Sequence, residues 1–229
     1  MLNAVDFSKW KNLSPKKEFV LRDKWLYTGN VSFLKGKPEA GKSLFAQQLI
    51  TAVATGKPWL GERIKRIKTY GVFCEDSEEK LWTRQCAINR YYCLNMKFAS
   101  LVNNVRLLSR VGKDNLLMVF DDKNVGHLTP YFEELLKDIR LFQPKLVVLD
   151  EVSDFFGGDE NNSSHVKQFV QKCCAHIARK VNCAVLLCKH GLIETGVWRD
   201  TMKFHMYAYP DEEGSSYLVN YISRDSKQK

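Results

Sequence analysis

Residues 36–43 read Gly36-Lys37-Pro38-Glu39-Ala40-Gly41-Lys42-Ser43, which is the pattern G-x-x-x-x-G-K-S. The apolar stretch 31–34 runs into this segment, and residues 44–53 follow it with a helical spacing of apolar side chains. A strand, a glycine-containing loop and a helix in this order are typical of a phosphate-binding loop. The backbone N–H groups of such a loop surround phosphate oxygens, and the N-terminus of the next helix adds favourable partial charge. The segment therefore predicts a site for a nucleoside triphosphate.

Two side chains of this loop predict direct contacts with the nucleotide. Lys42 is expected to reach the β- and γ-phosphates, and the hydroxyl group of Ser43 is expected to bind Mg²⁺. The alternative interpretation is a glycine turn followed by a lysine with no ligand, and the flanking strand and helix patterns argue against it. The predicted nucleotide-binding residues are Gly36, Lys37, Pro38, Glu39, Ala40, Gly41, Lys42, Ser43 and Leu44.

The composition is that of a globular protein in a reducing compartment. The chain has 229 residues, of which 45% are hydrophobic and 27% charged, and this length suits one large domain. Its seven cysteines form no C-x-x-C pair, which argues against a disulfide framework or a zinc ribbon. Residues 1–17 lack the apolar segment of a signal peptide, and no apolar run reaches the ~18 residues of a membrane span. We therefore expect a cytoplasmic protein with no membrane partner.

The net charge of +9 favours a polyanionic partner but does not identify one. The positive residues are scattered, and the densest group is Arg63, Lys65, Arg66 and Lys68, after the first predicted helix. No aromatic side chains accompany this group in a pattern typical of nucleic-acid stacking. A nucleic-acid-binding surface and a solvated basic surface both explain this group of basic residues.

The apolar pattern alternates between strands and helices along the chain. We expect residues 1–28 to be a lead-in packed on the core and residues 29–229 to form one α/β domain. Because nearly continuous apolar strands alternate with amphipathic helices, we expect a mainly parallel central sheet flanked by helices. Predicted strands cover 31–34, 70–74, 105–108, 117–120, 145–150 and 183–188, predicted helices cover about 43–56, 77–93, 129–142 and 164–180, and 203–209 with 216–223 predict a closing β-hairpin.

Ligands of such sheets bind beyond the carboxyl ends of the strands, where this chain has polar side chains. Asp150 ends a predicted strand of bulky apolar residues, which is the Walker B pattern for an aspartate that binds Mg²⁺. Glu75 follows the strand 70–74 and is the predicted base that orients the attacking water, with Glu151 as the competing base. His190 follows the strand 183–188 and is the predicted sensor of the γ-phosphate.

The segment after Glu75 also has a purely structural interpretation. Ser77 or Asp76 can cap the next helix, and the two glutamates that follow, at 78 and 79, favour the helix dipole. The catalytic and the capping interpretations use different residues, so both can hold.

In this order, the motifs resemble the RepA-like branch of the RecA-type P-loop ATPases. The resemblance rests on residues 36–43, 54–61 (ATGKPWLG), 75–77 (EDS), 146–150 (LVVLD), 155–161 (FFGGDEN) and 184–190 (AVLLCKH), and it spans about residues 25–225. Members of that branch are hexameric helicases of plasmid or phage replication, or uncharacterised ATPases of mobile elements. The resemblance implies a RecA-like fold, ATP and Mg²⁺ as ligands, single-stranded DNA as partner, and a ring of subunits. It also implies the roles given above for Lys42, Ser43, Glu75, Asp150 and His190.

Two positions depart from the pattern of that family. Glu39 stands where the family usually has glycine, and a carboxylate beside the phosphates disfavours ATP binding unless it points to solvent. If the backbone there requires a positive φ, a non-glycine residue also costs on the order of 1–3 kcal/mol. The family further has an arginine after the sensor strand that reaches the neighbouring subunit's nucleotide. Arg199 and Lys203 are the candidates for this trans finger, and a surface-loop charge is the alternative for each.

The sequence leaves three functional hypotheses. The first is a ring-forming ATPase that couples hydrolysis to movement on single-stranded DNA. The second is a nucleotide-binding regulator or scaffold with weak hydrolysis. It is compatible with Glu39 in the phosphate-binding loop and with a trans finger that the sequence does not identify. The third is a P-loop kinase for small molecules, which would usually have an arginine-rich lid that we do not find in the sequence.

Overall fold

The computed structural model describes residues 19–21, 26–94, 99–191, 197–198, 204–210 and 217–223. Its centre is a seven-stranded sheet with the order β12-β11-β3-β10-β8-β4-β5. All neighbouring pairs from β11 to β5 are parallel, and β12 is antiparallel to β11. The predicted α/β fold with a mainly parallel sheet and a C-terminal hairpin is therefore confirmed. The strands are β3 (Val31–Gly36), β4 (Thr69–Phe73), β5 (Val105–Ser109), β8 (Leu146–Asp150), β10 (Ala184–His190), β11 (Phe204–Pro210) and β12 (Tyr217–Ser223).

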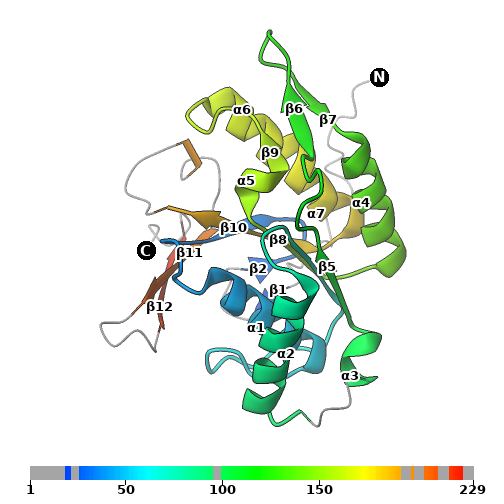
Figure 1. Cartoon of the computed structure of the whole chain (residues 1–229), viewed down its shortest axis with the longest axis vertical. Helices are drawn as coiled ribbons and strands as arrows, with labels where there is room; N and C mark the ends of the chain where they lie inside the picture. The colour runs from blue at the N-terminus through cyan, green and yellow to red at the C-terminus, as the bar shows by residue number, and fades with distance from the viewer. Residues whose placement is uncertain are drawn as a thin grey trace, which may run out of the picture.

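Helices cover both faces of this sheet (Figure 1). One face is covered by α1 (Lys42–Thr55), α2 (Glu78–Tyr91) and α3 (Ala99–Val102), and the other by α4 (Pro130–Phe142), α6 (Ser163–Gln168) and α7 (Ala175–Val181). A π-helical segment, η2 (Phe169–Cys174), joins α6 to α7, so the predicted helix 164–180 has a wider turn in its middle. The short helix α5 (Val152–Phe155) follows β8 directly.

The strands are buried on both faces, which explains why their sequences are continuous apolar runs. In β8 the side chains of Val147 and Leu149 belong to the core beneath α4 and α7. Those of Leu146 and Val148 belong to the core beneath α1. Successive side chains of a strand point to opposite faces, so a strand covered on both sides needs apolar residues at every position.

Smaller sheets lie outside the central one. The predicted strand 117–120 is β6 (Met118–Phe120), which pairs with β7 (Gly126–Leu128) and β9 (Phe156–Gly157) and not with the central sheet. β1 (Phe19–Leu21) pairs with β2 (Leu26–Tyr27). The sequence does not predict β1, β2, β7 and β9, because elements of two or three residues are too short to show a hydrophobic periodicity.

The first described residues pack on the core. Val20, Leu21 and Leu26 are buried in the same core as α1, whereas Trp10 and Trp25 lie outside the described residues. All seven cysteines are free, and five are buried, although Cys93 is exposed. Within the described residues, no helix is both long and apolar enough to span a membrane.

The helix that follows Glu75 has the predicted cap. The hydroxyl group of Ser77 accepts a hydrogen bond from the backbone N–H of Lys80 at 3.2 Å. The cap satisfies one of the free N–H groups at the start of α2, and two glutamates of its first turn favour the helix dipole. Ser77 is therefore the cap, which leaves Asp76 available for other contacts.

Candidate functional site

The phosphate-binding loop joins β3 to α1. Gly36 is the last residue of β3, and a Cβ at this position would lie 2.7 Å from the carbonyl oxygen of Ala208 in β11. Gly41 has a φ of 75°, a conformation that glycine adopts without strain. The side chains of residues 37–39 are exposed, whereas Ala40 is buried. Close packing under Gly36 and the left-handed turn at Gly41 thus hold the loop open to solvent at the start of α1.

Lys42 lies at the centre of the candidate site. Its Nζ atom donates to the carbonyl oxygens of Gly36 at 3.3 Å and Lys37 at 3.0 Å. The same atom lies 2.7 Å from Nδ1 of His190, a residue 148 positions later in the chain. β10 and β3 are parallel neighbours, and their register places His190 opposite Gly36. The parallel sheet therefore brings the predicted phosphate lysine and the predicted sensor into contact.

The electrostatics of this pair favour a neutral imidazole. Burial lowers the pKa of His190, and the positive charge of Lys42 lowers it further. Burial also lowers the pKa of Lys42, while the charge of Glu151 opposes this shift. A neutral His190 can accept a hydrogen bond from the Lys42 ammonium group at Nδ1. Its Nε2 atom is then protonated and faces the neighbouring carboxylates.

Two carboxylates lie near the other ring nitrogen of His190. Oε2 of Glu75 is 3.9 Å from Nε2, and Oε2 of Glu151 is 3.5 Å from it. The side chain of Glu75 is 62% exposed, whereas that of Glu151 is 2% exposed. Oε1 of Glu151 accepts the backbone N–H of His190 at 3.0 Å, and burial raises the pKa of Glu151 to about 7. One carboxylate thus faces solvent, and the other is fixed inside the protein.

Asp150 and Ser43 provide the oxygen ligands expected for Mg²⁺. Asp150 is the last residue of β8 and is 5% exposed. Burial raises its pKa to about 6, while a hydrogen bond with Ser43 opposes this shift. Mg²⁺ prefers hard oxygen ligands and is usually held by one or two protein groups together with substrate phosphates. The adjacent hydroxyl and carboxylate groups fit that ion. We call Lys42, Glu75, Asp150, Glu151 and His190 the strand-end cluster.

Sequence reasoning missed a further carboxylate beside this cluster. Asp154 lies in α5, and burial raises its pKa, as does the charge of Glu75. Among the described residues, its Oδ2 atom is buried and has no hydrogen-bond partner. In the sequence, Asp154 falls between the predicted strand 145–150 and the predicted helix 164–180, where a polar loop residue is ordinary. Only the fold of the segment after β8 brings it near Glu75 and His190.

The remaining predicted residues differ in how the structure places them. Leu44 is in the first turn of α1 and is 37% exposed. Arg199 and Lys203, the candidates for the trans finger, lie outside the described residues. The basic residues of 63–68 are in the loop between α1 and β4, where Arg63, Lys65, Arg66 and Lys68 are exposed.

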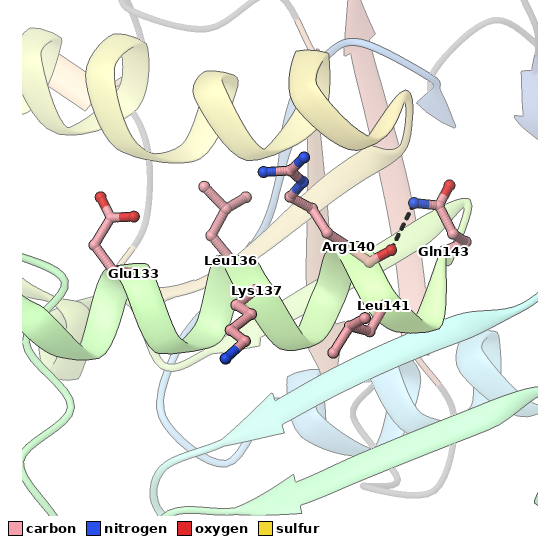
Figure 2. Close-up of a pocket in the computed structure, with 6 residues that line it drawn as sticks. All are labelled: Glu133, Leu136, Lys137, Arg140, Leu141 and Gln143. Atoms are coloured by element: carbon pink, nitrogen blue, oxygen red, sulfur yellow. Dashed lines mark hydrogen bonds between the residues drawn. The ribbon is translucent and has the colours of Figure 1, made fainter.

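A separate hollow of about 320 Å³ lies on α4 (Figure 2). Its lining residues are Glu133, Leu136, Lys137, Arg140, Leu141 and Gln143. In Figure 2, Leu136 and Arg140 point to one side of the helix and Lys137 to the other. None of the lining residues belongs to the strand-end cluster, and all come from one helix and the residue after it. We therefore place the candidate site at the strand ends.

Glu39 has a φ of 63°, and its side chain is exposed. Because a negative charge near the triphosphate opposes binding, we expect Glu39→Gly and Glu39→Gln each to lower the Kd of Mg-ATP about two- to fivefold at low salt. Isothermal titration measures this Kd. Glutamine keeps a Cβ at the positive φ, so only the glycine variant also relieves backbone strain. A gain for glycine without a gain for glutamine would contradict the electrostatic explanation.

Comparison with known proteins identifies a family whose model covers the candidate site. A family model described as AAA domain matches residues 1–192, which is more than half of the sequence. The matched range contains the phosphate-binding loop and every residue of the strand-end cluster. Among curated proteins, none matches the chain.

Proposed function

Because the chain belongs to the AAA domain family of P-loop ATPases, we propose that it is a RecA-type motor that hydrolyses ATP. The observation that carries this proposal is the contact between Lys42 Nζ and His190 Nδ1 at 2.7 Å, with Glu75 on the other side of the imidazole ring. These residues lie next to one another between the phosphate-binding loop and a solvent-facing carboxylate. Such an arrangement suits a site that binds a γ-phosphate and orients the water that attacks it.

Four members of the strand-end cluster, together with Ser43, have roles in the proposed reaction. Lys42 exchanges its present partners for the β- and γ-phosphate oxygens. Ser43 and Asp150 hold Mg²⁺, which neutralises charge on the phosphates. Glu75 accepts a proton from water as the water oxygen bonds to the γ-phosphorus and the bond to the β-phosphate oxygen breaks. His190 contacts the γ-phosphate and changes its hydrogen bonds when that group leaves.

We extend the proposal to a ring that moves on single-stranded DNA. The resemblance to RepA-like ATPases and the net charge of +9 support it. In this arrangement residues 29–229 form the ATPase domain and residues 1–28 the lead-in. A residue after β10, Arg199 or Lys203, reaches the nucleotide of the neighbouring subunit. Such fingers raise the hydrolysis rate by about 10³–10⁵-fold.

A second function, nucleotide binding without rapid turnover, is favoured by one observation. Glu39 places a carboxylate and a positive φ inside the phosphate-binding loop. Both features weaken a loop whose task is to surround phosphates. A protein that binds Mg-ATP and releases no phosphate, with or without DNA, would have this regulatory or scaffold function.

ATP turnover with and without a single-stranded oligonucleotide tests these alternatives. We expect the wild-type protein to release phosphate faster with DNA, and Lys42→Ala to reduce release to the background of the assay. No turnover above Lys42→Ala in either condition would contradict the ATPase. Turnover that is indifferent to DNA would contradict the DNA motor and leave the ATPase.

A further inference from the structure

A buried polar network connects helix α2 to the phosphate-binding helix α1. It begins at Asp76, the residue directly after Glu75. The side chain of Asp76 is 3% exposed. Its two carboxylate oxygens contact Nζ of Lys80 at 2.6 Å and Nη1 of Arg84 at 2.7 Å. Burial alone would raise the pKa of Asp76, but hydrogen bonds from Arg84 and Lys80 lower it below its usual value. Asp76 is therefore a charged anchor inside the protein.

Arg84 continues the network from α2 to α1. The same Nη1 atom donates to Oε1 of Gln47 at 3.1 Å, and the Arg84 side chain is only 13% exposed. Gln47 is fully buried on α1, four residues after Ser43. Its Nε2 atom donates to the carbonyl oxygen of Leu81 at 2.9 Å and to Oε1 of Gln85 at 3.0 Å. Both polar ends of Gln47 thus bind to α2.

The network also holds the backbone beside Glu75. The hydroxyl group of Ser109 in β5 donates to the carbonyl oxygen of Asp76 at 2.7 Å. The charges of Asp76 and Arg84 also act on the candidate site. Burial and the hydrogen bond with Ser43 have the largest effects on the pKa of Asp150. In addition, the charge of Asp76 raises this pKa and the charge of Arg84 lowers it. The backbone and the side chain of Asp76 are therefore both fixed within electrostatic range of the predicted magnesium ligand.

An apolar interface between α1 and α2 would bury the same surface without the desolvation penalty of a charged pair. The polar network instead favours one arrangement of the two helices, because Asp76 binds α2 through both carboxylate oxygens and Gln47 binds α2 through both ends of its amide. Here the fixed arrangement joins the residue next to Glu75 to the helix that begins with Lys42 and Ser43. The network is therefore suited to hold the base at a set distance from the phosphates.

We propose that Asp76 and Arg84 are positioning residues for ATP hydrolysis, which fix Glu75 relative to α1 through Gln47. The inference rests on the proposed ATPase function. Neither side chain touches the nucleotide in this role. A misplacement of ~1 Å at a reacting group can lower a rate ~10²-fold without loss of binding. The network therefore acts on turnover more than on affinity.

The variant Arg84→Gln tests this role. We expect kcat to fall at least ~10-fold while the Kd of Mg-ATP changes less than ~3-fold, because Lys42 and the loop are untouched. Asp76→Asn, which keeps the shape and removes the charge, carries the same expectation and replaces Arg84→Gln if that variant does not fold. Lys80→Gln is the matched control, since Lys80 pairs with the same carboxylate but is 62% exposed. We expect its kcat to stay within ~2-fold of wild type.

Phosphate release, titration of Mg-ATP and thermal unfolding are measured on the same preparations. Wild-type kcat in folded Arg84→Gln and Asp76→Asn overturns the positioning role while leaving the ATPase intact. A loss of affinity as large as the loss of kcat also overturns it, because the whole site would then be distorted. Absence of turnover in the wild-type protein contradicts the proposed function itself, and the positioning role with it.

Discussion

Glu75→Gln is expected to lower the ATP turnover number by about 10²–10⁴-fold, because it removes the base that accepts the proton of the attacking water. The side chain of Glu75 is 62% exposed and its Oε2 atom lies 3.9 Å from Nε2 of His190. It can therefore reach a water molecule at the γ-phosphate. Glutamine has the same size and keeps one oxygen, so we expect the Kd of Mg-ATP to stay within ~3-fold of wild type. Phosphate release under saturating Mg-ATP, with a separate binding titration, measures both quantities.

Glu151→Gln is the matched control, because Glu151 is the competing base. Its side chain is 2% exposed, and its Oε1 atom already accepts the backbone N–H of His190 at 3.0 Å. A glutamine oxygen can accept the same hydrogen bond. We therefore expect Glu151→Gln to lower kcat less than ~10-fold. The reverse result, a large loss for Glu151→Gln and a small one for Glu75→Gln, would reassign the base to Glu151.

The sequence predicted most of the fold because its decisive signals are local. The phosphate-binding loop is contiguous, and the apolar runs of β3, β4, β8 and β10 are long enough to stand out. Parallel strands also align their carboxyl ends, so the sequence could place Glu75, Asp150 and His190 at one edge of the sheet. Their proximity follows from topology alone. Their catalytic roles stay predictions.

The unpredicted parts depend on packing between segments far apart in the chain. The contact from Arg84 to Gln47 joins residues 37 positions apart on two helices, and it forms only when the helices cross at this point. In the sequence, Arg84 reads as an ordinary surface charge of α2. Asp154 likewise becomes part of the site only through the fold of the segment after β8. Helical periodicity predicts which face is apolar but not which polar side chains meet across it.

Glu151→Gln is also expected to stabilise the nucleotide-free protein, by an amount that depends on pH. Burial raises the pKa of Glu151 from its usual 4.5 to about 7, so the folded state binds this proton more tightly than the unfolded state. Between pH 4.5 and pH 7 the folded state therefore holds more protons, and wild-type stability falls as the pH rises. Above pH 7 the buried carboxylate destabilises the fold by on the order of 3 kcal/mol.

Thermal unfolding of the two glutamine variants at several pH values measures this effect. At pH 8 we expect Glu151→Gln to raise the Tm by about 6–12 °C, since ~1 kcal/mol shifts the Tm of a domain of this size by ~2–4 °C. Below pH 4.5 both forms are neutral at this position, and the difference should vanish. Glu75→Gln, at an exposed carboxylate of the same site, should leave the Tm within ~1 °C of wild type at every pH. Equal Tm values for Glu151→Gln and wild type at pH 8 would mean that Lys42 and His190 fully compensate the buried charge. A stabilised but still active Glu151→Gln would instead show that the site keeps a destabilising carboxylate in a place where it is not the base.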